Sequence, residues 1–226
     1  MKHLMIRGSF QVLAGAIFLA LVFSGLAQGQ GFQSPTQMKG TWDIELWGGG
    51  VVAQHDHTAA FNTLVWTGGA RFGRVLTVPR GQGWRHGTLE WDFGVVPVFV
   101  ISHPAAHGFE LDPLIFRWNF LRAGKRAPFV ELAGGVAFTD SNVPPGTTST
   151  FNFVPKFGYG WQFFTRPQRS FDVGLYVWHL SNAWLGRRNP SVNGLQLTMG
   201  YHWFKLQRDQ QTGRDGPHES DGGAKP

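Results

Sequence analysis

His179 and Ser181 are the residues whose types and spacing are best suited to chemistry. They lie two positions apart near the end of the segment 171–181, in which the same parity is otherwise apolar. A β-strand places alternate residues on one face, so the imidazole and the hydroxyl would project side by side from an apolar surface. A serine beside a histidine can act as a nucleophile with its general base. The apolar surroundings favour a lipid substrate.

Asn193 is a third polar residue of the same kind. It begins the segment 193–204 and shares its parity with Leu195 and Leu197. If this segment pairs with 171–181 as a hairpin, the amide joins the same patch, where a third polar group can orient the imidazole. Spacing alone also fits a plainer reading, in which a histidine and a serine at a strand end mark the membrane interface without any chemistry.

Eight segments show the alternation of a β-strand, and none shows a convincing helical period. Each has one apolar, often aromatic, parity and one parity of small, polar or charged residues. In the fourth segment the alternation blurs after Pro113, which predicts a β-bulge. The segments are 42–51, 62–76, 87–100, 108–120, 128–139, 149–164, 171–181 and 193–204.

The aromatic content decides which parity faces outward. The chain has 10 Trp and 20 Phe, and the interior of an eight-stranded barrel has room for side chains only. Placing the aromatics outside and the glycines and charges inside fits this volume. The sequence therefore predicts an all-β fold, an eight-stranded antiparallel transmembrane β-barrel of the outer-membrane type. Inside it, carboxylates are expected to pair with Arg71 and Lys156, and Glu90, Asp92 and Glu131 are expected to form structural ion pairs.

The ends of the chain differ from the barrel in composition. Residues 1–27 have the pattern of a signal peptide, with Lys2 and Arg7 before an apolar stretch and small residues up to Ala27. We expect a disordered lead-in at 28–40, the barrel at 41–205 and a disordered polar tail at 206–226. There is no Cys, so an exported chain would fold without disulfides.

Strand direction follows if the chain starts in the periplasm. The connections at 121–126 and 165–169 are then periplasmic and short, together with the longer one at 77–86. The connections at 52–61, 101–107, 140–148 and 182–192 lie outside. The seventh segment then runs outward, and His179 and Ser181 reach the level of the outer leaflet. Asp172, lower on that strand and of the inward parity, is too far away to serve His179.

Other partners are not indicated. The net charge is +6 with scattered basic residues, which does not predict nucleic-acid binding. His55, Asp56 and His57 form a conceivable metal cluster, but no other segment offers matching ligands, so a polar loop is the preferred interpretation and no metal or cofactor is expected.

Three stretches resemble the lipid A 3-O-deacylase (PagL-type) family. They are HLSNAWLGRRNP at 179–190, PFVELAGG at 128–135, and Phe151-Asn152-Phe153 with Gly158 and Gly160. The resemblance covers roughly the second half of the mature chain. It implies an enzyme of the bacterial outer membrane that hydrolyses the 3-O-linked acyl ester of lipid A, has lipid A or lipopolysaccharide as its partner and needs no cofactor. It leaves the oligomeric state open.

The resemblance also implies roles for individual residues. His179 would be the catalytic base, Ser181 the nucleophile, and Asn182 and Asn189 would lie at the oxyanion and substrate site. Asn193 stands where the family has an acidic residue, best known as Glu. An amide can still hold one tautomer of a histidine, but it offers no negative charge to the imidazolium.

The loop 182–192 carries two further points. Trp184 stands where the family pattern predicts a Gly, which would alter the backbone donor available to the oxyanion. Arg187 and Arg188 would contact lipid A phosphates, or would simply be solvated loop charges. Two alternatives to a lipid A deacylase remain. One is a catalytically silent barrel with a structural or surface-binding role, which the amide at Asn193 favours, and the other is an esterase acting on phospholipids.

Overall fold

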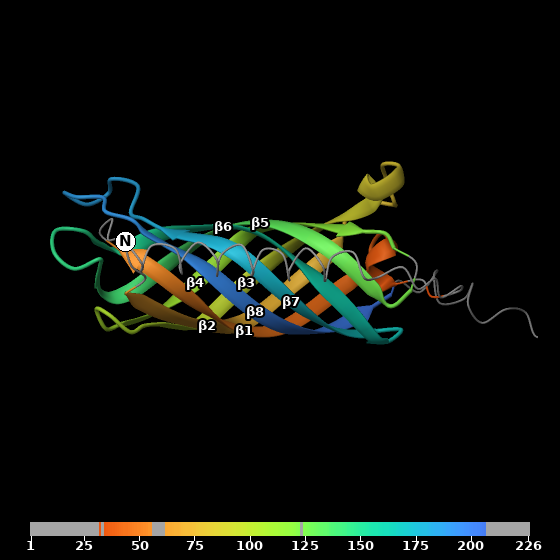
Figure 1. Ribbon diagram of the computed structural model, residues 1–226, viewed down its shortest axis with the longest axis horizontal. Helices are drawn as coiled ribbons and strands as arrows, with labels where there is room; N and C mark the ends of the chain where they lie inside the picture. Colours follow the sequence, from red (N-terminus) through yellow and green to blue (C-terminus); the bar gives the residue numbers. More distant parts are fainter. Residues whose placement is uncertain (1–31, 33, 56–61, 123, 207–226) are drawn as a thin grey trace, which may run out of the picture.

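The computed structural model describes residues 32, 34–55, 62–122 and 124–206, and there the chain forms a closed barrel of eight antiparallel strands (Figure 1). Each strand pairs with its neighbour in sequence, and β1 pairs with β8 to close the sheet. The strands are β1 (Trp42–His55), β2 (Thr63–Val75), β3 (Gly87–Ile101), β4 (Ala106–Phe120), β5 (Arg126–Val143), β6 (Ser149–Arg166), β7 (Arg169–Leu180) and β8 (Val192–Lys205). The predicted eight-stranded barrel is confirmed.

The barrel has two different ends. We call the end where β1, β3, β5 and β7 finish the loop end, because the long connection 181–191 lies there, drawn in blue at the left of Figure 1. The other end is the turn end. It carries the short helices η1 (Pro35–Gln37) and η2 (Gly83–Arg85), at the right of the figure. No helix among the described residues is long and apolar enough to cross a membrane.

The apolar parity of each strand faces outward, as predicted. Large side chains such as Trp66, Leu132, Phe157 and Val177 are exposed on the outside. Polar residues of the opposite parity are buried inside the barrel, which inverts the pattern of a water-soluble protein. In an apolar solvent this arrangement exposes hydrocarbon to hydrocarbon and lets the closed sheet satisfy its own backbone groups.

A bulge in β4 lies where the sequence predicted it. Pro113 and Leu114 are both exposed, and the register with β5 shifts between Leu111 and Leu114. Proline has no N–H to donate to the ladder, so the strand loses its pairing there. Before the bulge the even residues face inward, and after it the odd residues do. The shift turns Arg117 into the lumen.

The lumen contains a network of buried ion pairs. Arg71 lies 3.3 Å from both Glu45 and Glu131, and Lys156 lies 2.6 Å from Glu110 and 2.8 Å from Asp112. These pairs confirm the expected roles of the two cations. Arg117 adds a third cation, 2.9 Å from Glu131 and 3.3 Å from Asp172. His202 closes the network through Asp43, with 2.7 Å between Nδ1 and Oδ2.

Two lumen carboxylates do not follow the expectation. Glu90 accepts a hydrogen bond from Asn119 Nδ2 at 2.6 Å, and within the described ranges no cation forms an ion pair with Glu90 or Asp92. The expectation of a structural ion pair is therefore confirmed for Glu131 and is wrong for Glu90 and Asp92. The nearest lumen cation, Arg117, turns inward only because of the bulge and is taken by Glu131 and Asp172.

Apolar layers close the interior at both ends. At the turn end Phe164 packs with Ala127, Phe204 and Phe32. At the loop end a larger apolar cluster fills the lumen. It consists of Val51, Ala53, Val65, Phe99, Ile101, Ala106, Ala137, Val143, Val154, Trp178, Leu180 and Val192. A barrel filled in this way takes its ligands at the outside wall or the ends, and not through a central channel.

The structure differs from the expected disordered lead-in over residues 34–40. Ser34 and Thr36 are buried, and Thr88 donates a hydrogen bond to the Thr36 carbonyl at 2.5 Å. The segment is ordered because it covers the apolar layer at the turn end, where the Phe32 ring lies 5.5 Å from Phe164. The expected signal peptide at 1–27 and the tail from 207 onward lie outside the described residues.

Candidate active site

His179 and Asn193 face each other across the last hairpin. They are register partners in the β7–β8 pair, and the imidazole Nδ1 lies 2.7 Å from the amide Oδ1. Because an amide oxygen only accepts, Nδ1 carries the proton in this pair. Nε2 is then the unprotonated nitrogen and can take up a proton. The contact therefore holds His179 in the tautomer that a general base needs.

Ser181 lies one residue beyond β7 on the same outward face. Burial alternates through this segment: Val177, His179 and Ser181 reach the surface, whereas Trp178, Leu180 and Asn182 are buried. The backbone of Ser181 exchanges two hydrogen bonds with Phe153 of β6, at 2.7 and 3.1 Å. The serine is thus fixed to β6 while the histidine is fixed to β8.

The described chain contains no hydrogen bond between the side chains of His179 and Ser181. The structure does place both residues on one face of one strand, as their spacing predicted. Hydrogen bonds between a nucleophile and its base are often long without substrate and tighten when it binds. The contact with Asn193 orients the His179 imidazole, and Ser181 lies on the same outward face.

Ser191 joins His179 and Asn193 in the outward polar cluster, and it was not among the residues predicted for the site. Asn193 Nδ2 donates to Ser191 Oγ at 3.1 Å, while Asn193 Oδ1 faces His179. Both polar ends of the Asn193 amide are therefore engaged. The signal was present in the sequence, because Ser191 precedes Asn193 by two residues and shares its parity.

Asn182 organises the loop 181–191. Its side chain is buried, with Nδ2 donating to the Arg188 carbonyl at 2.8 Å and Oδ1 accepting from the Trp184 N–H at 3.0 Å. Its backbone N–H donates to Asn189 Oδ1 at 3.1 Å. Asn189 is therefore held beside Asn182, the residue that follows Ser181. The side chain of Asn182 is committed to the loop itself.

The turn after Asn182 uses the left-handed backbone region. Ala183 has φ 49° and Trp184 φ 66°, values that glycine adopts without the steric cost paid by other residues. The Gly that the resemblance predicts at the position of Trp184 would adopt this backbone conformation without that cost. The Trp184 N–H remains bound to Asn182 Oδ1, and its side chain is 74% exposed. The loop thus presents a large apolar side chain beside the site.

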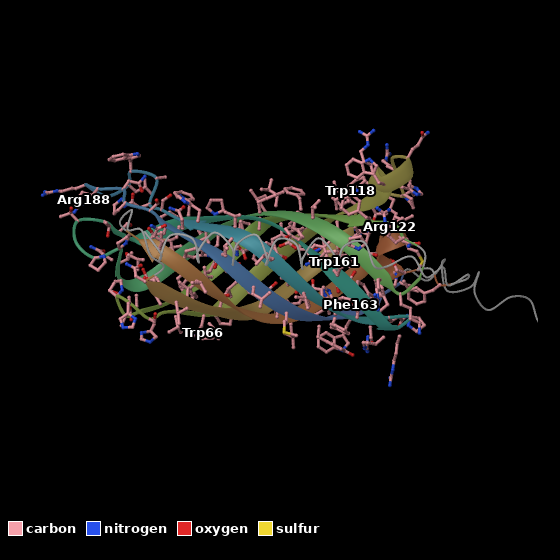
Figure 2. All side chains as sticks on the ribbon, in the orientation of Figure 1. Trp66, Trp118, Arg122, Trp161, Phe163 and Arg188 are labelled. Atoms are coloured by element: carbon pink, nitrogen blue, oxygen red, sulfur yellow. The ribbon has the colours of Figure 1, made fainter. Side chains whose placement is uncertain are left out.

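The two arginines of this loop project from the loop end, where Figure 2 labels Arg188. Both side chains are exposed. The Arg188 backbone N–H donates to the Thr147 carbonyl at 3.1 Å, which ties the loop to the β5–β6 connection. Asp172, by contrast, is buried in the lumen and pairs with Arg117 and His202, so it does not serve His179.

Within the described residues, the one group of possible metal ligands lies in the lumen. Among the described residues, Glu45, Asp172 and His202 bring three possible ligand atoms together. Arg71 and Arg117 lie 3.3 and 3.8 Å from the same Glu45 oxygen, so the charges are already balanced and we interpret the group as part of the ion-pair network. Asp56 and His57 of the conceivable cluster at the loop end lie outside the described residues.

The surface around the site is apolar. Val177 precedes His179 on its face, and Leu195 and Leu197 follow Asn193 on β8. Their exposed fractions are 60, 48 and 54%. A polar cluster in such a wall can bind a substrate that has an ester next to hydrocarbon chains.

Comparison with solved structures gives barrels of the same kind at low identity. The crystal structure of the outer membrane enzyme PagL is 18% identical, with 69% of this chain and 97% of that chain covered and a TM-score of 0.46. The N-terminal β-barrel domain of Pseudomonas aeruginosa OprF is 14% identical, with 73% of this chain and 98% of that chain covered and a TM-score of 0.43. Ail of Yersinia pestis, in complex with a heparin analogue, is 13% identical, with 74% of this chain and 100% of that chain covered and a TM-score of 0.44. Among curated proteins, none matches.

The family comparison is more specific. A family model described as lipid A 3-O-deacylase (PagL) matches residues 47–202, which run from β1 to β8 and include His179, Ser181 and Asn193. The matched part contains the whole outward cluster described above. The chain therefore belongs to the lipid A 3-O-deacylase (PagL) family.

Proposed function

We propose that this chain is a lipid A 3-O-deacylase in which Ser181 is the nucleophile and His179 the general base. The observation that carries the proposal is the 2.7 Å contact between His179 Nδ1 and Asn193 Oδ1 on the lipid-facing wall. Family membership indicates a hydrolase in the bacterial outer membrane. The site then lies in the outer leaflet, beside lipid A.

The reaction is ester hydrolysis in two steps. His179 Nε2 takes the proton of Ser181, and Oγ attacks the carbonyl of the 3-O-linked hydroxyacyl chain. The tetrahedral intermediate collapses to an acyl-enzyme, and the protonated imidazole gives its proton to the sugar oxygen as it leaves. Water, activated by the same histidine, then hydrolyses the acyl-enzyme and releases the fatty acid.

The oxyanion is best served by Asn189. Its Oδ1 is held by the backbone N–H of the residue after Ser181, so its Nδ2 is the donor that can reach the carbonyl oxygen. Asn182 positions Asn189 and the loop, because both ends of its own side chain are engaged. The acyl chains would lie along Val177, Leu195 and Leu197.

Substrate phosphates would be contacted by Arg187 and Arg188. Both guanidinium groups are exposed at the loop end, where the headgroup of a lipid in the outer leaflet lies. A guanidinium can bind phosphate with two parallel hydrogen bonds, which suits the phosphorylated disaccharide of lipid A. Trp184 and Leu185, the exposed apolar residues of the same loop, would enter the acyl region.

The alternative is a catalytically silent barrel, and a specific observation favours it. The third member of the cluster is a neutral amide, which leaves the imidazolium without a charged partner. The two proposals differ in whether Ser181 and His179 hydrolyse an ester. An esterase that acts on phospholipids is a further outcome of the same test.

Mass spectra of lipid A distinguish these outcomes. The full chain is expressed in a Gram-negative host, and barrel folding is checked by heat-modifiable migration on gels. We expect lipid A to lose one 3-hydroxyacyl chain, and to keep it when Ser181→Ala or His179→Ala is expressed instead. Ser141→Ala, an exposed serine at the same end, is the matched control and should behave as the unmodified chain. Unchanged lipid A with a folded barrel would favour the silent barrel, and lysophospholipids would favour the phospholipid esterase.

A further inference from the structure

Basic residues are concentrated at the turn end of the barrel. Outside the lumen, the described chain has only Arg187 and Arg188 at the loop end. The other cationic side chains form a ring at the turn end, which we call the basic girdle. It consists of Lys39, Arg74, Arg80, Arg85, Arg122, Lys125, Arg126, Arg166, Arg169 and Lys205.

Acidic residues do not balance this ring. Within the described ranges, Asp140 is the one exposed carboxylate, and it lies at the loop end of β5. All other described Asp and Glu side chains are buried in the lumen and do not reach the outer surface. The surface of the turn end is therefore strongly positive.

Several of these arginines lie close to outward aromatic rings near the turn end. The Arg74 guanidinium lies 5.0 Å from the centre of the Trp42 ring, Arg169 lies 5.9 Å from Trp203, and Arg126 lies 5.9 Å from Phe163. Figure 2 labels Trp118, Arg122, Trp161 and Phe163 in the half of the barrel toward the turn end. Outward aromatic residues near the strand ends of such barrels lie at the level of the lipid headgroups.

We propose that the basic girdle binds the phosphates of anionic phospholipids in the membrane leaflet at the turn end. This is the periplasmic leaflet when the active site lies in the outer leaflet, so the choice of leaflet rests on the proposed function. Guanidinium groups bind phosphate oxygens with paired hydrogen bonds, and basic residues beside a membrane attract anionic lipids. A soluble polyanion fits less well, because arginines stacked on interfacial rings lie beside lipid.

The girdle also complements the site at the opposite end. Contacts at both headgroup levels fix the height of a barrel in the bilayer. The loop end reaches lipid A through the loop 181–191, and the girdle would hold the turn end at the other surface. This keeps His179 and Ser181 at a constant depth relative to the ester bond.

Retention of lipids by the reconstituted full chain tests the proposal. The protein is placed in nanodiscs of equal phosphatidylglycerol and phosphatidylcholine with the same acyl chains, and the lipids that stay bound are counted by native mass spectrometry. We expect about threefold or greater enrichment of phosphatidylglycerol, decreasing as salt rises. Absence of enrichment in the unmodified chain would overturn the proposal.

Paired variants locate the binding surface. Arg126→Gln with Arg169→Gln should remove most of the enrichment, whereas Arg187→Gln with Arg188→Gln, the same change in charge at the loop end, should remove a clearly smaller part of it, because only two cations lie there. The reverse result would overturn the proposal. Arg126→Lys with Arg169→Lys keeps the charge and should keep a large part of the enrichment, and the salt dependence of the unmodified chain needs no variant at all. Ser181→Ala should retain lipid as the unmodified chain does, so failure of the girdle and failure of the deacylase proposal are distinguishable.

Discussion

Asn193 is the residue on which the strength of the catalytic group depends most. Its oxygen lies 2.7 Å from His179 Nδ1, so it supplies the geometry of a triad. A carboxylate at this position would supply geometry and also a negative charge that stabilises the imidazolium formed during the reaction. In the proposed mechanism, His179 is therefore oriented by a partner that carries no charge.

Replacing Asn193 by Glu should speed up the reaction. We expect the kcat/KM for 3-O-deacylation of purified lipid A to rise about tenfold, equivalent to ~1.4 kcal/mol of transition-state stabilisation. Asn193→Asp, which keeps the size of the side chain, should change the rate in the same direction, and Asn193→Ala should lower it. A rate for the Glu variant at or below that of the unmodified chain would contradict the charge argument.

Ser191 should act through Asn193. Without the hydroxyl that accepts from Nδ2, the amide can rotate and present a donor to His179 Nδ1, which disfavours the useful tautomer. We expect Ser191→Ala to lower kcat about three- to tenfold, in line with the loss of one hydrogen bond. Ser191→Thr should restore most of the rate.

A double-mutant cycle checks this route. In the Asn193→Glu background, the supporting group no longer has a donor end that needs to be fixed, so Ser191→Ala should have little effect on kcat. An equal effect in both backgrounds would assign Ser191 a role that does not pass through residue 193.

Parity alone placed His179, Ser181 and Asn193 on one outward face, and the structure agrees. The register of the hairpin was beyond the sequence, because a slip of two residues keeps every side chain on its face and would still have separated Asn193 from His179. Ser191 has the same parity, but it lies one residue before β8, so its parity did not by itself show a contact with Asn193. Its role depends on how the loop re-enters β8.

At the scale of the elements, the loop 181–191 is the part that the strands do not determine. Asn182 holds it together from the inside, and the backbone of Ser181 is fixed to β6. The sequence could show that this segment is polar and lies between two strands. Its fold depends on side-chain to backbone hydrogen bonds, which have no periodic signal.

Asn182→Ala should loosen this loop and leave the barrel intact. The variant leaves the Trp184 N–H and the Arg188 carbonyl without their hydrogen-bond partner. Each buried polar group left unpaired costs about 1–3 kcal/mol of free energy. We expect deacylation to fall about tenfold, while the thermal unfolding of the barrel in detergent stays unchanged. Asn182→Asp keeps the acceptor for Trp184 and should be intermediate. A fall in barrel stability that matches the loss of activity would contradict a role limited to the loop.

The bulge in β4 shows a further limit of sequence-based expectation. Its position followed from Pro113, but its consequence did not. The bulge changes which parity faces inward and brings Arg117 against Glu131 and Asp172. A single irregular position in β4 thus determines that Arg117 faces the lumen and pairs with its carboxylates.

For the whole molecule, folding depends on how the lumen tolerates buried charge. The interior is a stack of apolar, charged and apolar layers, and, among the described residues, six of the eight buried carboxylates of the charged layer pair with Arg71, Arg117, Lys156 or His202. Small residues make room for this layer. A Cβ at Gly135 would collide with Asp112 and Glu110, the carboxylates that bind Lys156. The alternation predicted this use of glycine in general, although not which charges meet.

Lys156→Met should destabilise the barrel strongly. It leaves Glu110 and Asp112 together in the lumen without their cation, and breaking a buried pair in this way costs about 3–5 kcal/mol. The temperature at which the folded band disappears in heat-modifiability gels should fall markedly. Lys125→Met, an exposed lysine, should stay within about 0.5 kcal/mol of the unmodified chain. Equal stability of the two variants would contradict a structural role for the lumen network.

The central claim is that Ser181, supported by His179, removes the 3-O-linked acyl chain of lipid A at the outer wall. Its most direct test is the release of free 3-hydroxy fatty acid from purified lipid A by the refolded chain, measured by gas chromatography with mass spectrometry. We expect one 3-hydroxy fatty acid to be released from each lipid A molecule, with many turnovers per protein, and no release by the folded Ser181→Ala variant. A folded unmodified chain that releases no acid, or a Ser181→Ala variant that releases it at the same rate, would contradict the claim.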